Sequence, residues 1–209
     1  MMPDSALSAH VAAELVRDGY AIVDEFLEDS TIAALASECA ILQAGGALHP
    51  AAIGRGGDRH MDAAVRGDRT QWFDPAKLSA PQERYWSRMD MVRKALSQEL
   101  LLGLEELDAQ FAFYPPGAGY ARHRDRFRDN DARVLSTVLY LNADWRDAQG
   151  GALRLYLRAS GPVAHRDIFP TAGTLALFLS ADFEHEVLPA SRDRLSIAGW
   201  MRRTESALR

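Results

Sequence analysis

Beyond Gly103 the sequence is divided into short apolar segments, and this division constrains the fold more than any other feature. Turn-forming residues such as Pro115-Pro116-Gly117 and Gly150-Gly151 separate most of the segments. We predict strands at 109–114, 120–125, 134–142, 152–157, 163–168, 174–180, 183–187 and 194–202. Short strands at this spacing are typical of two packed antiparallel sheets, as in a jelly roll or a related barrel.

The first hundred residues have helical periodicity instead. A helix is predicted over residues 5–17, stopped at Gly19, and a second from a cap at Asp29 or Ser30 to about Leu42. Ser79 and Gln82 form a capping-box pattern that opens a third, longer helix. We also expect a strand at 20–23 and an exposed loop at 46–68. The prediction is therefore a mainly β protein whose jelly-roll core is buttressed by N-terminal α-helices.

Composition excludes several classes of protein. The net charge of −5 gives no overall attraction to nucleic acid or to an anionic membrane surface. Cys39 is the only cysteine, which excludes an internal disulfide and a cysteine-based zinc site. No apolar run is long enough to span a bilayer, and the N-terminus lacks the apolar core of a signal peptide. We expect a cytoplasmic protein with no nucleic-acid or membrane partner.

One pair of residues carries the pattern of a metal site. In a strand, His123 and Asp125 point to the same face, about 7 Å apart along the chain, so both could bind one ion. His185 is the best candidate for a third ligand from another strand. Two histidines and one carboxylate form the facial triad of non-haem iron(II) oxygenases. The alternative remains open that the His-x-Asp spacing is accidental and that His185 is a partly exposed side chain between Glu184 and Glu186.

Arg194 follows His185 by nine residues. It shares one strand face with Ser196, Ala198 and Trp200, while the opposite face is apolar. If the small-residue face lines the interior, Arg194 is a buried cation that needs a planar anion, such as the carboxylate of a cosubstrate. The alternative is an exposed Arg194, or one paired with an acidic neighbour such as Asp193 or Glu186.

Together these features resemble the iron(II)- and 2-oxoglutarate-dependent dioxygenases of the prolyl 4-hydroxylase family. The segments 113–125, 138–145 and 150–154 are similar to the hypoxia-inducible-factor prolyl hydroxylases and their bacterial relatives. The resemblance runs from about residue 60 to 203 and implies a double-stranded β-helix (jelly-roll) dioxygenase domain at 101–204. Residues 1–100 would then supply helical support and a substrate loop. The segment 42–60 has no assigned counterpart.

The resemblance implies a role for each matching residue. His123, Asp125 and His185 would hold Fe(2+), and Arg194 with Tyr140 would bind the distal carboxylate of 2-oxoglutarate. Tyr114 and Ser196 complete the predicted cosubstrate site, and Arg133, Trp72 and Arg66 are the predicted substrate contacts. Dioxygen is the second cosubstrate and L-ascorbate a plausible helper. The implied reaction is 4-hydroxylation of a prolyl residue in a protein, with succinate and CO2 formed.

The protein partner is named by resemblance alone, and elongation factor Tu is one candidate. The enzyme alternative is an oxygenase of a free amino acid or another small molecule. The non-enzyme alternative is a cupin-like metal-binding module, which would have no need for Arg194. A zinc hydrolase could use two histidines and one aspartate, but it would need neither Arg194 nor Tyr140.

Two further segments carry hypotheses. Residues 61–74 are interpreted as a loop that closes over substrate, with Gly67 favouring mobility. Alternate arginines in 122–128 are predicted to point away from the metal as a basic stripe. That stripe is interpreted either as a solvated face or as a docking surface for an acidic partner. The arginine-rich loop 127–131 departs from the animal enzymes and leaves the target open.

Overall fold

The computed structural model describes residues 2–52, 60–62, 64–126, 132–157 and 164–204. The helices are α1 (Asp4–Asp18), α2 (Asp29–Ala44) and α3 (Ala80–Glu99), with a short 3-10 helix, η2 (Asp147–Gln149). The strands are β1 (Tyr20–Val23), β2 (His49–Pro50), β3 (Arg69–Trp72), β4 (Glu106–Tyr114), β5 (Tyr120–His123), β6 (Arg133–Tyr140), β7 (Leu153–Tyr156), β8 (His165–Ile168), β9 (Leu175–Leu179), β10 (Glu184–Val187) and β11 (Arg194–Arg202).

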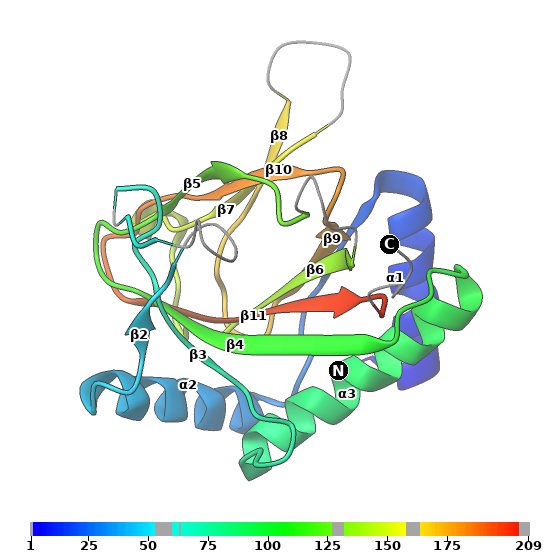
Figure 1. Cartoon of the computed structure of the whole chain (residues 1–209), viewed down its shortest axis with the longest axis horizontal. Helices are drawn as coiled ribbons and strands as arrows, with labels where there is room; N and C mark the ends of the chain where they lie inside the picture. The colour runs from blue at the N-terminus through cyan, green and yellow to red at the C-terminus, as the bar shows by residue number, and fades with distance from the viewer. Residues whose placement is uncertain (1, 53–59, 63, 127–131, 158–163, 205–209) are drawn as a thin grey trace.

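The strands form two antiparallel sheets that face each other (Figure 1). The major sheet has the order β1-β9-β6-β11-β4-β3-β2, and the minor sheet has the order β5-β10-β7-β8. The three α-helices lie along the side of the major sheet that faces away from the minor sheet. The predicted mainly β jelly-roll fold with supporting helices is confirmed.

Two apolar cores follow from this layering. The larger core joins the three helices to the outer face of the major sheet, with Leu7, Leu35 and Met89 fully buried among its members. The smaller core lies between the sheets and includes Leu155 and Phe178. Because the site residues come from strands that border this smaller core, the sheets hold the site between two rigid layers.

The helix ends show which local signals were correct. Ser79 and Gln82 form the predicted capping box at the start of α3, and Gly19 ends α1 with a φ of 78°. The predicted cap of α2 is wrong, because the helix begins at Asp29 itself and no side chain caps it.

Strands from both parts of the sequence share the major sheet. Strand β1 pairs with β9, and β3 pairs with β4, so residues before 100 are hydrogen-bonded to residues after it. The predicted strand 134–142 ends early, at Tyr140. The Asn142 side chain accepts a hydrogen bond from the Leu195 amide and donates one to the Leu195 carbonyl. These side-chain hydrogen bonds lie where the regular pairing of β6 with β11 ends.

The 46–68 segment is not simply an exposed loop. Leu48 and Asp68 are buried, and the Ala51 amide donates to the Asp68 carbonyl. Within the predicted closing loop, Gly67 packs so tightly against Ala118 that a Cβ atom on it would lie 2.9 Å from the Ala118 Cβ. Gly67 therefore allows its segment to approach Ala118 closely, a role that we did not predict for it.

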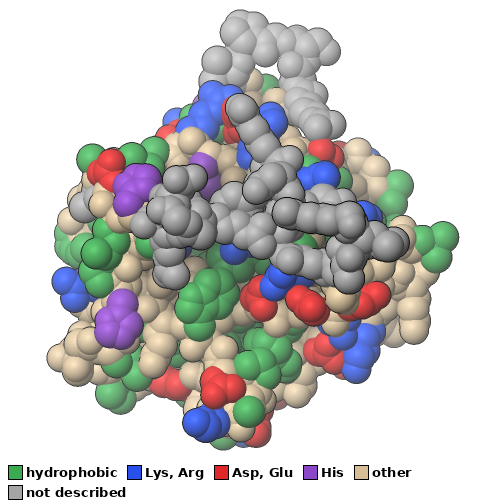
Figure 2. Space-filling model, viewed as in Figure 1, with side chains coloured by type: hydrophobic (Ala, Val, Ile, Leu, Met, Phe, Trp, Pro, Cys, Tyr) green, Lys and Arg blue, Asp and Glu red, His purple; other side chains and the backbone are tan. Residues whose placement is uncertain are grey.

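The surface carries charges of both signs. On the face seen in Figure 2, acidic and basic side chains are interspersed among the described residues. Among the described helices, none combines the length and apolar character needed to cross a membrane. The arginine-rich loop 127–131, most of segment 53–60 and the turn at 160–162 lie outside the described residues.

Candidate metal centre and adjoining pocket

A pocket with a volume of about 560 Å³ opens between the two sheets. Every predicted site residue except Tyr140 lines it. The lining also includes residues that we did not predict, among them Trp200, Asp68 and Thr137. The structure therefore brings residues from β3, β5, β6, β10 and β11 together around one cavity.

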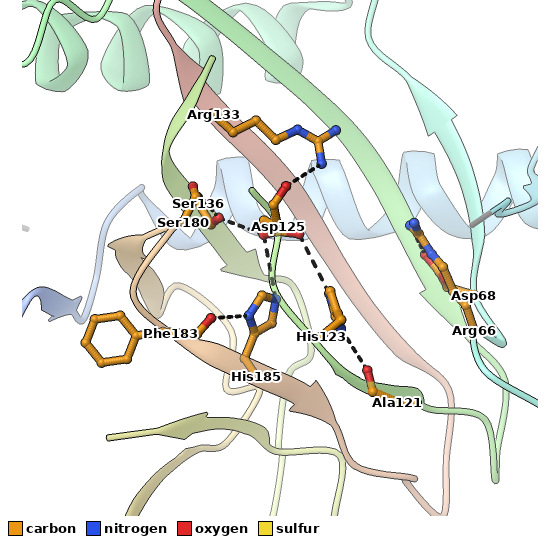
Figure 3. Close-up of polar contacts among 10 residues, drawn as sticks. All are labelled: Arg66, Asp68, Ala121, His123, Asp125, Arg133, Ser136, Ser180, Phe183 and His185. Carbon is orange, nitrogen blue, oxygen red and sulfur yellow. Dashed lines mark hydrogen bonds and ion pairs between the residues drawn. The ribbon is translucent and has the colours of Figure 1, made fainter. Parts of the chain in front are cut away.

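His123, Asp125 and His185 meet in the lining of this pocket (Figure 3). His123 lies directly opposite His185 in the register of β5 and β10. The Nε2 atom of His123 is 3.7 Å from Asp125 Oδ1, and the Nε2 atom of His185 is 3.6 Å from Asp125 Oδ2. One ligand atom from each residue lies within 4.8 Å of the others, which is close enough for all three to bind one ion.

Asp125 does not reach this cluster as part of a regular strand. Strand β5 ends at His123, and Asp125 follows in a bend, so the predicted strand 120–125 is two residues too long. The β5–β10 pairing is also irregular, because β5 advances three residues, from Tyr120 to His123, where β10 advances two. This irregularity is a β-bulge, a device that redirects side chains at functional sites.

The histidine rings are oriented by backbone carbonyls. His123 Nδ1 lies 2.7 Å from the Ala121 carbonyl oxygen, and His185 Nδ1 lies 3.3 Å from the Phe183 carbonyl oxygen. An Nδ1–H that donates to a carbonyl assigns the lone pair to Nε2. Each Nε2 faces Asp125, so the donor set is two imidazole nitrogens and a carboxylate, which suits Fe(II) and related divalent metals.

The carboxylate of Asp125 is held from the other side. Ser136 Oγ donates to Asp125 Oδ2 at 2.7 Å, and the Ser136 and Ser180 hydroxyls lie 2.8 Å apart. Burial alone would raise the pKa of Asp125, but His185, His123 and Arg133 hold that pKa well below its usual range. The group is therefore an ionised carboxylate whose orientation is fixed by hydroxyl groups.

Arg194 lies deeper in the pocket and is 1% exposed, so the interpretation of an exposed Arg194 is wrong. Its Nε donates to the Gly151 carbonyl at 2.8 Å, and its Nη1 donates to Ser196 Oγ at 3.3 Å. Its Nη2 has no hydrogen-bond partner among the described residues, nor does the buried Tyr140 hydroxyl. Burial raises the pKa of Tyr140 to about 12, so this hydroxyl is a donor at neutral pH.

The rings around Arg194 define the shape of this subsite. Its guanidinium carbon lies 5.1 Å from the ring centres of both Tyr114 and Tyr140. Tyr114 is paired with Arg194 across the β4–β11 register. A buried cation with one unused N–H group and an adjacent unused hydroxyl matches a carboxylate, which offers two acceptor oxygens in one plane.

The pocket mouth is aromatic and cationic. Trp72 is 50% exposed, and its ring centre lies 5.7 Å from that of Trp200. The Arg133 guanidinium lies 3.9 Å from the Trp200 ring centre. Trp200 was placed on the same strand face as Arg194 by the sequence pattern and does line the pocket, but it was not assigned a role in the site.

Arg66, a predicted substrate contact, lines the pocket and is held in an ion pair. It binds Asp68 with two parallel hydrogen bonds, Nε to Oδ1 at 2.7 Å and Nη2 to Oδ2 at 3.0 Å. The Asp68 side chain is fully buried. Sequence reasoning missed this partner, because an acidic residue in a polar loop has no signal of burial.

The predicted basic stripe is only partly present. Arg122 is half exposed and pairs with Glu184 on the next strand, as expected for a solvated face. Arg124 is also half exposed and lies 3.9 Å from the same Glu184, and it borders the pocket as well. Arg128 lies outside the described residues.

Comparison with known proteins identifies similar folds and sequences. Residues 109–202 match the family model of the 2OG-Fe(II) oxygenase superfamily. A crystal structure of a Pseudomonas putida prolyl-4-hydroxylase is 43% identical, covers 94% of this chain and 99% of its own, and has a TM-score of 0.84. A prolyl hydroxylase from Trichoplax adhaerens, in complex with a hypoxia inducible factor oxygen degradation domain peptide fragment, is 27% identical, with coverage of 95% and 90% and a TM-score of 0.84.

A curated relative from Caenorhabditis elegans is described as a hypoxia-inducible factor prolyl hydroxylase. It is 31% identical in an alignment of 206 positions, which covers 93% of this chain and 28% of the relative. This chain thus spans little more than a quarter of the length of that protein.

The buried imidazole of His185 leads to a prediction about acid stability. Burial lowers its pKa to about 4 from an ordinary value of 6.5. Between these values the unfolded chain binds the proton and the folded chain does not, so stability is lost as the pH falls through this range. At pH 5 the loss is about 2 kcal/mol.

Urea unfolding of the metal-free protein at pH 7 and pH 5 measures this loss. We expect the His185→Gln variant to lose about 2 kcal/mol less than wild type between the two pH values. The His165→Gln variant, altered on the partly exposed strand β8, is the matched control and should keep the wild-type pH dependence. An unchanged pH dependence in His185→Gln would contradict the prediction.

Proposed function

Because the chain belongs to the prolyl 4-hydroxylase family of the 2OG-Fe(II) oxygenase superfamily, we propose that it is an Fe(II)- and 2-oxoglutarate-dependent dioxygenase that hydroxylates a prolyl residue of a protein. The products are 4-hydroxyproline, succinate and CO2. The observation that carries this proposal is the pair of unpartnered buried donors, Arg194 Nη2 and the Tyr140 hydroxyl, beside a His-Asp-His cluster. A metal-binding module or a hydrolase has no use for these donors.

His123, Asp125 and His185 hold the iron in this proposal. Their donor atoms are the right type and number, and three ligands leave three positions for 2-oxoglutarate and dioxygen. Bound Fe(II) would activate dioxygen, which is the oxidant: 2-oxoglutarate would give two electrons on becoming succinate and CO2, and the prolyl C–H bond the other two. Ser136 keeps the Asp125 carboxylate in place, and the Ala121 and Phe183 carbonyls keep the two imidazoles in place.

Arg194 selects the cosubstrate. Its Nη2 and the Tyr140 hydroxyl donate to the distal carboxylate, while Ser196 and the Gly151 carbonyl fix the guanidinium plane. Tyr114 forms a wall of the same subsite. Because the guanidinium is already desolvated and oriented, little reorganisation is needed when a dicarboxylate enters.

The substrate lies at the aromatic mouth. Trp72 and the Arg133–Trp200 pair present flat surfaces and a cation at the opening of the pocket, above the metal ligands. Such surfaces can hold a proline ring in one orientation and shield it from water. Arg66 contributes to this region through its ion pair with Asp68.

Three finer assignments complete the proposal. L-ascorbate is the reductant that restores iron after turnovers without substrate. The target is a protein of the same cell, with elongation factor Tu as the first to test. The enzyme acts in the cytoplasm, where 2-oxoglutarate is available.

Mass spectrometry tests the reaction directly. A lysate is incubated with the enzyme, Fe(II), 2-oxoglutarate and ascorbate, and its peptides are searched for prolines that have gained one oxygen atom. We expect the gain on a proline within a protein, and only when 2-oxoglutarate is added. If free proline were hydroxylated and no protein were, the enzyme would act on a small molecule.

Asp125→Ala tests the metal assignment. The substitution removes the only charged member of the cluster, so we expect most of the iron affinity and all turnover to be lost. The matched control is Asp167→Ala, which removes an ion-paired carboxylate on strand β8, away from the cluster. Full activity in Asp125→Ala would exclude this cluster as the iron site.

Arg194→Lys tests the cosubstrate assignment. Lysine keeps the charge but loses the planar fork. Hydrogen bonds to charged groups contribute about 1.5–3 kcal/mol, so the apparent Michaelis constant for 2-oxoglutarate should rise roughly tenfold to hundredfold. Arg154→Lys, which breaks a similar fork with Asp167 on the minor sheet, should leave the constant unchanged. A wild-type constant in Arg194→Lys would place the carboxylate elsewhere.

A further inference from the structure

Three flat groups are stacked beside the metal cluster. The ring of Tyr120 lies parallel to the imidazole of His123, with ring centres 3.6 Å apart and planes 18° apart. The guanidinium carbon of Arg66 lies 4.8 Å from the centre of the Tyr120 ring. His123 is therefore in contact with a ring that Arg66 itself contacts.

The bulge in β5 makes this stack possible. In a regular strand, residues 120 and 123 would point to opposite faces. Because β5 advances three residues against two of β10, the Tyr120 and His123 side chains can face the same way. The ring of Tyr120 then limits the rotation of the His123 imidazole, whose Nδ1 is already bonded to Ala121.

The Arg66 side chain, at the end of the stack away from His123, is held in place by Asp68. Its two hydrogen bonds to Asp68 run in parallel and form a bidentate pair, a geometry that restricts the orientation of the guanidinium group. The Asp68 side chain is fully buried, whereas that of Arg66 is 16% exposed. An arginine held in this way cannot turn to donate to a substrate without leaving a buried carboxylate unpaired.

The backbone joins the same two segments. The Gly67 amide donates to the Gly119 carbonyl, and the Ala121 amide donates to the Val65 carbonyl, so residues 65–67 extend the edge of β5. Gly67 permits this approach, because a Cβ on it would lie 2.9 Å from the Ala118 Cβ and 3.5 Å from the Gly119 carbonyl oxygen. The described part of the predicted closing segment is thus connected to a metal ligand by side chains and by backbone.

We propose that Asp68, Arg66 and Tyr120 are positioning residues that connect segment 64–68 to His123, so that metal binding and the order of this segment stabilise each other. This proposal rests on the assignment of His123, Asp125 and His185 as the metal site. Coupling of this kind is reciprocal. A change that loosens the segment lowers the metal affinity, and metal binding in turn orders the segment. Residues that orient metal ligands from outside typically contribute tenfold to hundredfold to metal affinity.

The effect of these residues on metal affinity can be tested by titrating the protein with Mn2+ and monitoring binding by electron paramagnetic resonance. Mn2+ uses the same ligand types as Fe(II) and is not oxidised during the measurement. We expect Tyr120→Leu to weaken Mn2+ binding about tenfold, because leucine has no flat ring to stack. Tyr120→Phe keeps the ring and should bind Mn2+ as wild type does.

Asp68→Asn provides a second test that does not alter the ring. The substitution removes the negative charge from the Arg66–Asp68 ion pair while keeping the shape of the side chain. It should therefore weaken Mn2+ binding, but less than Tyr120→Leu does. If Tyr120→Leu does not fold, as judged by its thermal unfolding, this variant decides the outcome.

The minor sheet offers matched controls for both substitutions. Arg122 lies 3.7 Å from the ring centre of Tyr156, a stack that does not include a metal ligand. Arg154 and Asp167 form a bidentate fork with both distances at 2.8 Å. Tyr156→Leu and Asp167→Asn should therefore leave Mn2+ affinity unchanged.

Hydrogen exchange tests the other half of the link. We expect Mn2+ to slow exchange in peptides that contain the Gly67 and Ala121 amides of the wild type. This slowing should be lost in Tyr120→Leu at Mn2+ concentrations that saturate the variant, and kept in Tyr156→Leu.

The outcomes separate the link from the function on which it rests. Wild-type Mn2+ affinity in both Tyr120→Leu and Asp68→Asn, with slowing of exchange retained, would overturn the link and leave the metal site intact. Equal Mn2+ binding by wild type and Asp125→Ala would instead overturn the metal assignment.

Discussion

The pairing of β5 with β10 is the constraint on which the rest of the site depends. It places His123 opposite His185 on neighbouring strands of the minor sheet, and the chain then bends so that Asp125 faces both rings. A shift of the register by one residue would turn His185 to the other face of the sheet and disperse the cluster. The bulge adds the Tyr120 ring beside His123. One local irregularity therefore influences both the geometry of the His-Asp-His cluster and its contact with the segment before β3.

Arg194 imposes a second constraint from the opposite sheet. A desolvated guanidinium with an unused N–H is costly, and the fold accepts that cost between two apolar cores that exclude water. The long pairings of β11 with β4 and β6 hold the residue, and Gly151 and Ser196 accept hydrogen bonds from its Nε and Nη1. The unused donors are thus oriented before any ligand arrives, which is the condition for a selective carboxylate site.

Much of this architecture could be predicted from local patterns. Alternating apolar residues and turn residues located the strands, and the Ser79–Gln82 capping box marked α3. Parity along one strand placed Arg194 and Ser196 on the inner face of β11, where the structure also has them. Resemblance alone suggested the role that we propose for Tyr140, which lies outside the pocket lining and has no periodic signal of its own. These features depend on residues close together in sequence, or on motifs shared across a family.

The features that could not be predicted depend on contacts between distant segments. Period-two reasoning cannot find a bulge, so it extended β5 to Asp125 and placed Tyr120 away from His123. It also treated Gly67 as a source of mobility, because the Ala118 backbone against which it packs lies more than fifty residues away in the sequence. Asp68 was overlooked for the same reason: its burial depends on the fork from Arg66 and on the Ala51 amide that binds its carbonyl. A polar loop in the sequence is thus, in the folded chain, a buried ion pair held against a metal-site strand, and its polarity reflects that internal pairing more than exposure to water.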